Sequence, residues 1–167
     1  MLGVNNNNVA VGFYTDGDGN NHGYGYNIRT HTFSTVTIPV AGVTSLTATS
    51  INTYGDVAGF YVNPATGNTG GFLLTHTGQF FDVAVSGAFS TMALGVNDHD
   101  EVVGVTTPNS NLAELDGITW TPTGGFTTVD DPNGAGTTTI NGVNNAGDLV
   151  GFYVDSNGNT DGMLAAP

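Results

Sequence analysis

The sequence predicts an all-β, β-propeller-like fold of about four blades, each built from four antiparallel strands. Short runs of Val, Thr, Phe and Tyr alternate with clusters of Gly, Asn, Asp and Pro along the chain, which is typical of strands joined by turns. A motif with a central glycine occurs four times, and its glycines at positions 12, 59, 104 and 151 are 47, 45 and 47 residues apart. No window shows the 3.6-residue period of an amphipathic helix over three turns.

The motif divides the chain into repeats at approximately 1–45, 46–90, 91–137 and 138–167, the last of them truncated. Each copy is preceded by Val-Asn or Ile-Asn, so the period involves more than one motif. We expect residues 1–167 to form a single repeat domain, which is long enough to bury a core. Four blades of four strands need sixteen strands and the sequence supplies fifteen, so the first or the last blade is expected to be incomplete.

The second repeat shows the expected strands most clearly, at Leu46–Asn52, Asp56–Val62, Gly71–His76 and Phe80–Val85. The first two are joined by a tight turn rich in Asn and Gly, residues that adopt the positive φ angles such turns need. We expect the asparagine that opens this turn, Asn52 here, to cap it by accepting a hydrogen bond from the backbone two residues further on. The glycine inside the second strand, Gly59 here, predicts a β-bulge or the close approach of another backbone.

The loop between the second and third strands is the most polar part of the first and last repeats. It places Asp and Asn on alternate residues near glycines, a spacing that lets oxygen ligands surround a hard cation such as calcium. The candidate calcium ligands are Asp16, Asp18 and Asn20 in the first repeat, and Asp155, Asn157, Asn159 and Asp161 in the last. The alternative is a solvated loop, because the same residue types dominate turns. His31 and His76 occupy matching repeat positions, so we interpret them as repeat features and not as one metal site.

The charge of the chain excludes several classes of partner. The sequence has no Lys and a single Arg, Arg29, whereas Asp and Glu together number 14. The net charge is therefore −13 at pH 7. Nucleic acids and anionic membrane surfaces both require a basic patch, so neither is an expected partner. No stretch approaches the roughly 20 apolar residues of a membrane-spanning helix, so no membrane insertion is expected. The absence of cysteine excludes disulfides and thiolate metal sites.

Three stretches of the chain resemble a known family of bacterial extracellular repeats. They are Gly-Val-Asn-Asn-x-Gly-Asp-Leu-Val-Gly-Phe-Tyr at 142–153, the loop Asp-x-x-Gly-x-x-x-Gly with a following apolar pair at 155–164, and Gly-Phe-Thr-Thr-Val-Asp-Asp-Pro-Asn-Gly-Ala at 125–135. Through these stretches the chain resembles the HAF repeat family over nearly its whole length. The resemblance implies a secreted or surface-exposed, β-propeller-like protein, and it implies no activity and no functional residues.

We therefore expect a non-enzymatic structural protein, extracellular or on a bacterial cell surface. A composition poor in Lys and Arg and rich in Gly, Asn and Thr is typical of secreted microbial proteins. An incomplete blade leaves an unpaired strand edge, so the expected partners are copies of the protein itself, in an oligomer or fibre. The alternative is a calcium-dependent, lectin-like module that binds carbohydrate through exposed aromatic side chains. A hydrolase ranks last, because the adjacent carboxylates Asp130 and Asp131 are expected to point to opposite faces.

Overall fold

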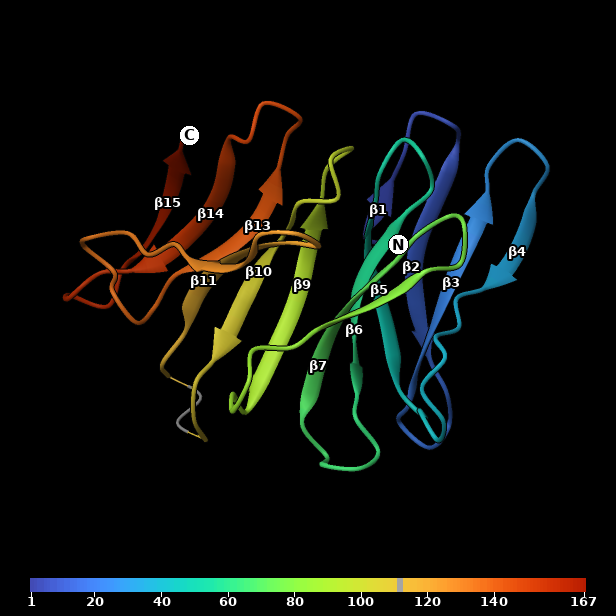
Figure 1. Ribbon diagram of the computed structural model, residues 1–167, viewed down its shortest axis with the longest axis horizontal. Coiled ribbons are helices and arrows are strands. Elements are labelled where there is room, and N and C mark those ends of the chain that lie inside the picture. Colours follow the sequence, from blue (N-terminus) through green and yellow to red (C-terminus); the bar gives the residue numbers. More distant parts are fainter. Residues whose placement is uncertain (111–112) are drawn as a thin grey trace.

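The computed structural model describes residues 1–110 and 113–167, and every regular element in these ranges is a β-strand (Figure 1). The strands form four groups that follow one another in the chain. Group 1 consists of β1 (Gly3–Val4), β2 (Val9–Thr15), β3 (Asn21–Asn27) and β4 (Thr32–Thr35). Group 2 consists of β5 (Leu46–Ile51), β6 (Val57–Val62), β7 (Thr69–Leu74) and β8 (Phe80–Val83). Group 3 consists of β9 (Ser90–Val96), β10 (Val102–Thr107), β11 (Asp116–Thr121) and β12 (Gly125–Thr128), and group 4 of β13 (Thr139–Val143), β14 (Leu149–Val154) and β15 (Thr160–Ala165).

The all-β prediction is confirmed, and the strands of group 2 lie close to their expected positions. β5 ends one residue earlier than expected because Asn52 belongs to the turn, where its backbone N–H donates to the Asp56 carbonyl at 3.0 Å. β7 begins two residues earlier than expected because it pairs with the whole of β6, up to the Val62 and Thr69 pair. Strand boundaries thus depend on the pairing partner as well as on local sequence.

Within each group every strand pairs antiparallel with the next one in the chain. One parallel bridge between Thr69 and Ser90 also links groups 2 and 3 into an eight-stranded sheet. Group 4 has three strands among the described residues. β15 therefore lacks the fourth strand that covers the corresponding strands β3, β7 and β11.

The groups lie side by side in chain order along the longest axis of the molecule (Figure 1). The second strand of each group packs against the first strand of the next, so that β2 contacts β5, β6 contacts β9 and β10 contacts β13. Groups 1 and 4 lie at opposite ends of this row, and no strand pairing joins them within residues 1–110 and 113–167. The described strands form an open row and not the closed ring of a complete propeller.

Hydrophobic cores fill the three boundaries between successive groups. Each core combines apolar residues of the second or third strand of one group with residues of the first two strands of the next. The three cores include Val11 with Leu46 and Ala48, Leu73 with Ala93 and Val102, and Val103 with Ile140 and Leu149. Because these side chains are buried between groups, each group depends on its neighbours for stability.

A β-bulge at the central glycine of the motif confirms the prediction made for that position. The pairing of β5 with β6 shifts register between Ala48 and Ser50, next to Gly59. A Cβ atom on Gly59 would overlap the backbone oxygen of Thr47, so the first strand passes too close for a side chain here. The same shift occurs at Gly104 in the β9–β10 pair and at the equivalent glycine of the β13–β14 pair.

The predicted asparagine caps the turn between the first and second strands of every group. Its Oδ1 accepts hydrogen bonds from two backbone N–H groups of its own turn, at Asn5, Asn52, Asn97 and Asn144. In groups 1–3 its Nδ2 also donates to the backbone carbonyl of the same asparagine in the next group, at 3.0, 3.1 and 3.0 Å. This series of bonds, termed the asparagine ladder, joins successive groups through the residue that also shapes each turn.

Replacing Asn97 by alanine is expected to lower the free energy of unfolding by about 1–3 kcal/mol, because Asn97 is buried and its loss leaves backbone groups of His99, Glu101 and Asn144 without their hydrogen-bond partners. The matched control is Asn144→Ala. Asn144 caps the same kind of turn, and its Nδ2 donates to Asp148 as that of Asn97 does to Glu101, but among the described residues it donates no ladder bond to a next group. Urea unfolding of both variants measures the difference, and an equal loss in the two would argue against any contribution from the ladder.

Candidate functional site

The first predicted calcium loop is organised by Asp16, which follows β2. Its Oδ1 accepts hydrogen bonds from the backbone N–H groups of Asp18 and Asn20, both at 2.9 Å, and its Oδ2 lies 2.7 Å from Nε2 of His22. The contact with His22, aided by the loop amides, lowers the pKa of Asp16 to about 2. Both carboxylate oxygens of Asp16 have partners within the chain, so this residue acts as the cap of its loop.

Asp155 caps the equivalent loop of group 4. Its Oδ1 accepts hydrogen bonds from the backbone N–H groups of Asn157 and Asn159, both at 2.8 Å, and its Oδ2 accepts from the side-chain amides of the same residues. These bonds, with the Asn159 backbone foremost, lower the pKa of the Asp155 carboxyl. Asp161, the remaining candidate ligand, is exposed on β15. The two asparagines turn their amide nitrogens toward the carboxylate, so they would have to rotate to offer oxygen to calcium.

The two predicted calcium loops do not come together, because groups 1 and 4 lie at opposite ends of the row (Figure 1). No group of three or more His, Cys, Asp or Glu side chains suited to a metal ion occurs in residues 1–110 or 113–167. His31 and His76, which occupy matching positions, have different partners: the Tyr26 hydroxyl at 2.9 Å and the Asp56 carboxylate at 2.8 Å. The observed hydrogen bonds favour turn capping, and calcium binding stays a prediction.

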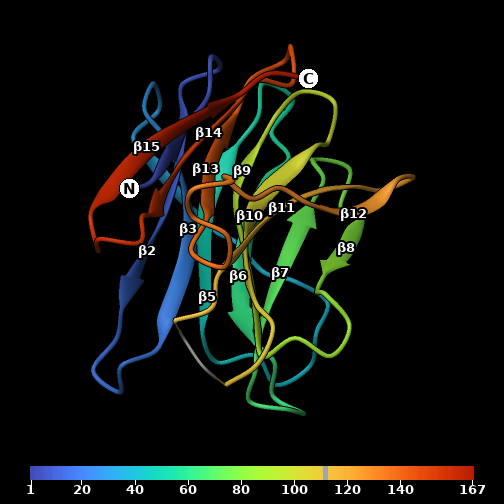
Figure 2. The ribbon, with the colours of Figure 1, turned by 90° about the vertical axis from the view of Figure 1, so that its left-hand side faces the viewer.

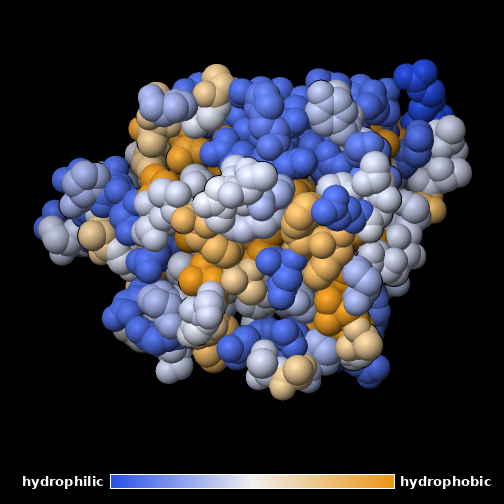
Figure 3. Space-filling view, viewed as in Figure 1, coloured by the Kyte–Doolittle hydropathy of each residue, from blue (hydrophilic) through white to orange (hydrophobic). Residues whose placement is uncertain are grey.

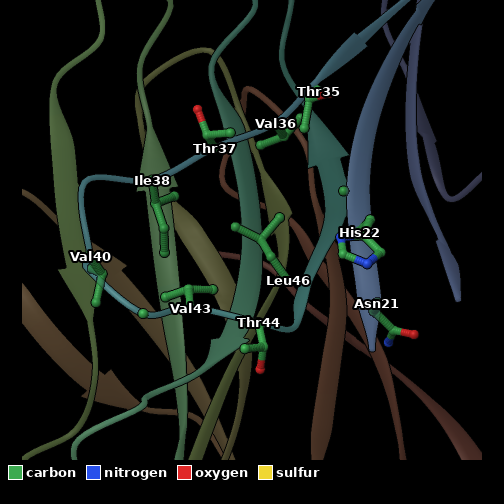
Figure 4. A pocket seen from close by; sticks show the side chains of 12 residues that line it. Asn21, His22, Thr35, Val36, Thr37, Ile38, Val40, Val43, Thr44 and Leu46 are labelled. Atoms are coloured by element: carbon green, nitrogen blue, oxygen red, sulfur yellow. The ribbon is translucent and has the colours of Figure 1, made fainter. Parts of the chain in front are cut away.

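His22 also borders a small pocket that was not predicted from the sequence. The connecting segment 36–45 lines it with apolar side chains such as Val36 and Val40, and His22 lies on β3 at the opposite side (Figure 4). The ring of Tyr14 stacks on the imidazole of His22 with 5.0 Å between the ring centroids. The pocket has a volume of about 200 Å³, smaller than the roughly 300–1,000 Å³ of typical small-molecule sites, so it suits only a small group.

A second cluster of titratable side chains lies around the first turns of groups 2 and 3 and includes His76 from the turn between β7 and β8. The buried carboxylate of Asp56 accepts hydrogen bonds from the backbone N–H and from Nδ1 of His76, at 2.7 and 2.8 Å. Burial alone would raise the pKa of Asp56, but these bonds hold it below its usual value. The pKa of Asp100 in the neighbouring turn is raised, first by burial and then by the charge of Asp56. The fold therefore disfavours the charged form of Asp100.

Replacing Asp100 by asparagine is expected to stabilise the protein at neutral pH. Because the folded-state pKa of Asp100 is raised, its contribution to stability is present at acid pH and is lost as the pH rises through that pKa. Asparagine removes the charge and suits the left-handed φ of 58° at this position. We expect a gain of about 0.5–1 kcal/mol near neutral pH. Thermal unfolding should show this gain shrinking as the pH falls through the raised pKa and vanishing below about pH 4, near the unfolded-state pKa; a gain independent of pH would exclude the charge as its cause.

The outer side of group 4 has no neighbouring group in the described chain, and Figure 2 looks onto this end, with β14 and β15 in front. Leu164 on β15 is 75% exposed, whereas the equivalent Leu73 of group 2 is fully buried against group 3. A Cβ atom on Gly162 would meet no atom within 4 Å. The apolar surface formed by Val150, Phe152 and Leu164 is termed the trailing face.

The outer side of group 1 is open at the other end of the row. Tyr14 is 59% exposed, whereas the equivalent Tyr61 of group 2 is 2% exposed. Met1, Val4 and Phe33 are also exposed, and together with Tyr14 they form an apolar and aromatic surface termed the leading face. Neither face was predicted, although the motif positions of Val150 and Tyr14 mark them as equivalents of residues that face a neighbouring group.

The surface view in the orientation of Figure 1 is mostly hydrophilic in its upper part, and hydrophobic residues are concentrated lower, over the middle of the sheets (Figure 3). The described residues contain no helix long and apolar enough to cross a membrane.

No model of a known protein family matches the chain, and no curated protein is significantly similar to it. The resemblance to the HAF repeats stays a prediction from the sequence.

Proposed function

We propose that the protein is a non-enzymatic extracellular structural protein, and that copies of it assemble through the incomplete group 4. Its four groups would be the blades of an open, β-propeller-like repeat domain. The recurring pairing order and the bulges at Gly59, Gly104 and Gly151 support this interpretation of the groups as blades. The hydrophobic cores at all three boundaries support a single domain.

The observation that carries the proposal is the free edge of β15. In groups 1–3 the corresponding strand pairs with a fourth strand, but β15 pairs only with β14 among the described residues. Within residues 1–110 and 113–167 no strand covers its other edge, which suits pairing with another chain. Proteins commonly protect such an edge with several charged residues or proline, and the sequence of β15 offers only Asp161.

Composition supports the extracellular location. Trypsin-like proteases cleave after Lys or Arg, and the chain offers them only Arg29. A non-enzymatic role is supported by the two His–Asp pairs, His22–Asp16 and His76–Asp56. Both carboxylate oxygens of each aspartate accept hydrogen bonds that hold turns in place.

Sedimentation velocity and negative-stain imaging of the purified chain test the proposed assembly. We expect particles larger than the monomer. They should form more readily near 0.15 M salt than at low salt, because a net charge of −13 on each copy opposes association and salt screens the repulsion. A monomer at every protein and salt concentration would exclude self-assembly.

Calcium-dependent carbohydrate binding is the second candidate function, and one observation favours it. Exposed Tyr14 stacks on His22, which in turn contacts Asp16 of the predicted calcium loop. An exposed aromatic ring beside oxygen ligands suits sugar binding. Adding calcium to chelator-treated protein is then expected to raise the melting temperature, and Asp16→Asn to reduce that rise. A wild-type protein that does not respond to calcium would exclude this function.

A further inference from the structure

We infer that copies of this protein stack head to tail, with the trailing face of one copy on the leading face of the next. The inference rests on the proposed self-assembly, and it places the contact on the outer faces of groups 4 and 1 and not on the edge of β15. It follows from a comparison of the two ends of the row with the boundaries inside it.

The trailing face consists of the same motif positions that, in groups 1–3, pack against the following group. The residue before the central glycine is buried against the next group in groups 1–3, at Val11, Ala58 and Val103. The equivalent residue of group 4, Val150, is half exposed. A Cβ atom on Gly71 would lie 3.2 Å from the backbone nitrogen of Ala93, which belongs to the next group. The open space at the equivalent Gly162 therefore has room for the first strand of a further group.

The leading face consists of the motif positions that, in groups 2–4, pack against the preceding group. The residue four positions before the ladder asparagine is fully buried against the preceding group in groups 2–4, at Ala48, Ala93 and Ile140. In group 1 this residue is Met1, and it is exposed. Tyr14 is the exposed counterpart of Tyr61, which packs in the core between groups 1 and 2. The leading face thus exposes apolar positions whose equivalents in groups 2–4 are covered by the preceding group.

The asparagine ladder ends in the same complementary way. Nδ2 of Asn52 and Nδ2 of Asn97 each contact a carboxylate of their own turn and donate to the next group. Nδ2 of Asn144 contacts the carboxylate of Asp148 in its own turn. Within the described residues there is no next group to accept a ladder bond from it. At the other end, the carbonyl of Asn5 occupies the position that accepts this bond in groups 2–4. Stacking would add one rung, from Asn144 to Asn5 of the next copy.

A second copy of the chain is therefore the occupant that the two faces specify. The protein already forms this interface three times internally, and its two ends carry the two complementary halves. A contact between unlike faces is heterologous, so it leaves one face free at each end of a dimer and continues into a ring or a fibre.

Two single variants and their mixture test the inference on the full chain. Leu164→Arg places a charge on the trailing face and Val4→Arg places one on the leading face, and both side chains are exposed, so both variants should fold. The control is Tyr54→Arg, which adds the same charge at an exposed side chain outside both faces. Circular dichroism checks folding, and sedimentation velocity measures the size of the particles.

We expect the Tyr54→Arg variant to assemble like the wild type, and each face variant alone to remain monomeric. A mixture of the two face variants should form dimers and nothing larger, because each copy supplies one intact face. If the wild type assembles and both face variants still do, the contact lies elsewhere, for example at the β15 edge, and the inference fails while self-assembly stands. If a single face variant forms dimers by itself, the contact joins like faces and the inference is wrong. A monomeric wild type would overturn both proposals.

Discussion

The Gly104→Ala variant is expected to lose about 3 kcal/mol or more of folding free energy, the upper end for a small residue enlarged inside a packed region. The added Cβ atom would overlap the backbone oxygen of Met92 and lie 3.2 Å from Cα of Ala93. Both neighbours are backbone atoms of the paired strand β9, so no side-chain rotation relieves the overlap. Because domains are stable by only about 5–15 kcal/mol, urea unfolding should show a large fall in the midpoint.

The matched control is Gly162→Ala, at a strand glycine with open space around its Cβ position. Alanine normally improves a strand relative to glycine by reducing the freedom of the unfolded chain. We therefore expect a change of less than about 0.5 kcal/mol, or a small gain, in dilute monomeric protein. A loss at Gly162 as large as that at Gly104 would mean that the overlap with Met92 is not the cause.

The Leu73→Ala variant is expected to lose about 3–4 kcal/mol, near the middle of the range of about 2–5 kcal/mol for a large aliphatic side chain removed from a packed core. Leu73 is fully buried in the core between groups 2 and 3, with Ala93, Val102 and Trp120 among its neighbours. These side chains are held by the paired strands of groups 2 and 3, so the cavity left by the missing atoms cannot close fully. Thermal or urea unfolding of the purified variant measures the loss.

The matched control for this prediction is Leu164→Ala, the same substitution at the equivalent position of group 4. Leu164 is exposed, so in dilute solution the substitution should change stability by less than about 0.5 kcal/mol. Under conditions that favour assembly, the same variant should form fewer or smaller particles. Similar losses for the two leucines in dilute solution would show that exposure does not distinguish them.

Features that depend on a few neighbouring residues were predicted correctly from the sequence. The asparagine cap of the first turn occurs in every group, with the predicted bond from two residues further on at Asn97, whereas at Asn52 the donors are three and four residues on. The bulge at Gly59 was predicted because glycine in the middle of a strand usually reflects close backbone approach. The number of strands was also correct, with fifteen in the described residues.

Features that depend on packing between groups were not predictable in the same way. Tyr14 and Tyr61 occupy the same place in the motif, yet of the two only Tyr61 is buried, because group 2 packs against a preceding group and group 1 does not in the described chain. The backbone carbonyl that accepts the ladder bond from the Asn52 side chain lies 45 residues away, and a single sequence carries no sign of that contact. Closure into a ring depends on the rotation between successive sheets, which the motif does not encode, so a closed propeller could not be distinguished from an open row.

The row of groups should unfold from its two ends. Groups 2 and 3 each share a core with two neighbours, whereas groups 1 and 4 each share one, so in a one-dimensional array the terminal units are the least protected. Backbone amides of β6 and β10 should exchange hydrogen with solvent most slowly, and those of β2 and β14 faster, through opening of the outer groups alone. In a head-to-tail polymer every unit has two neighbours, and fraying would be confined to the tips of the particle.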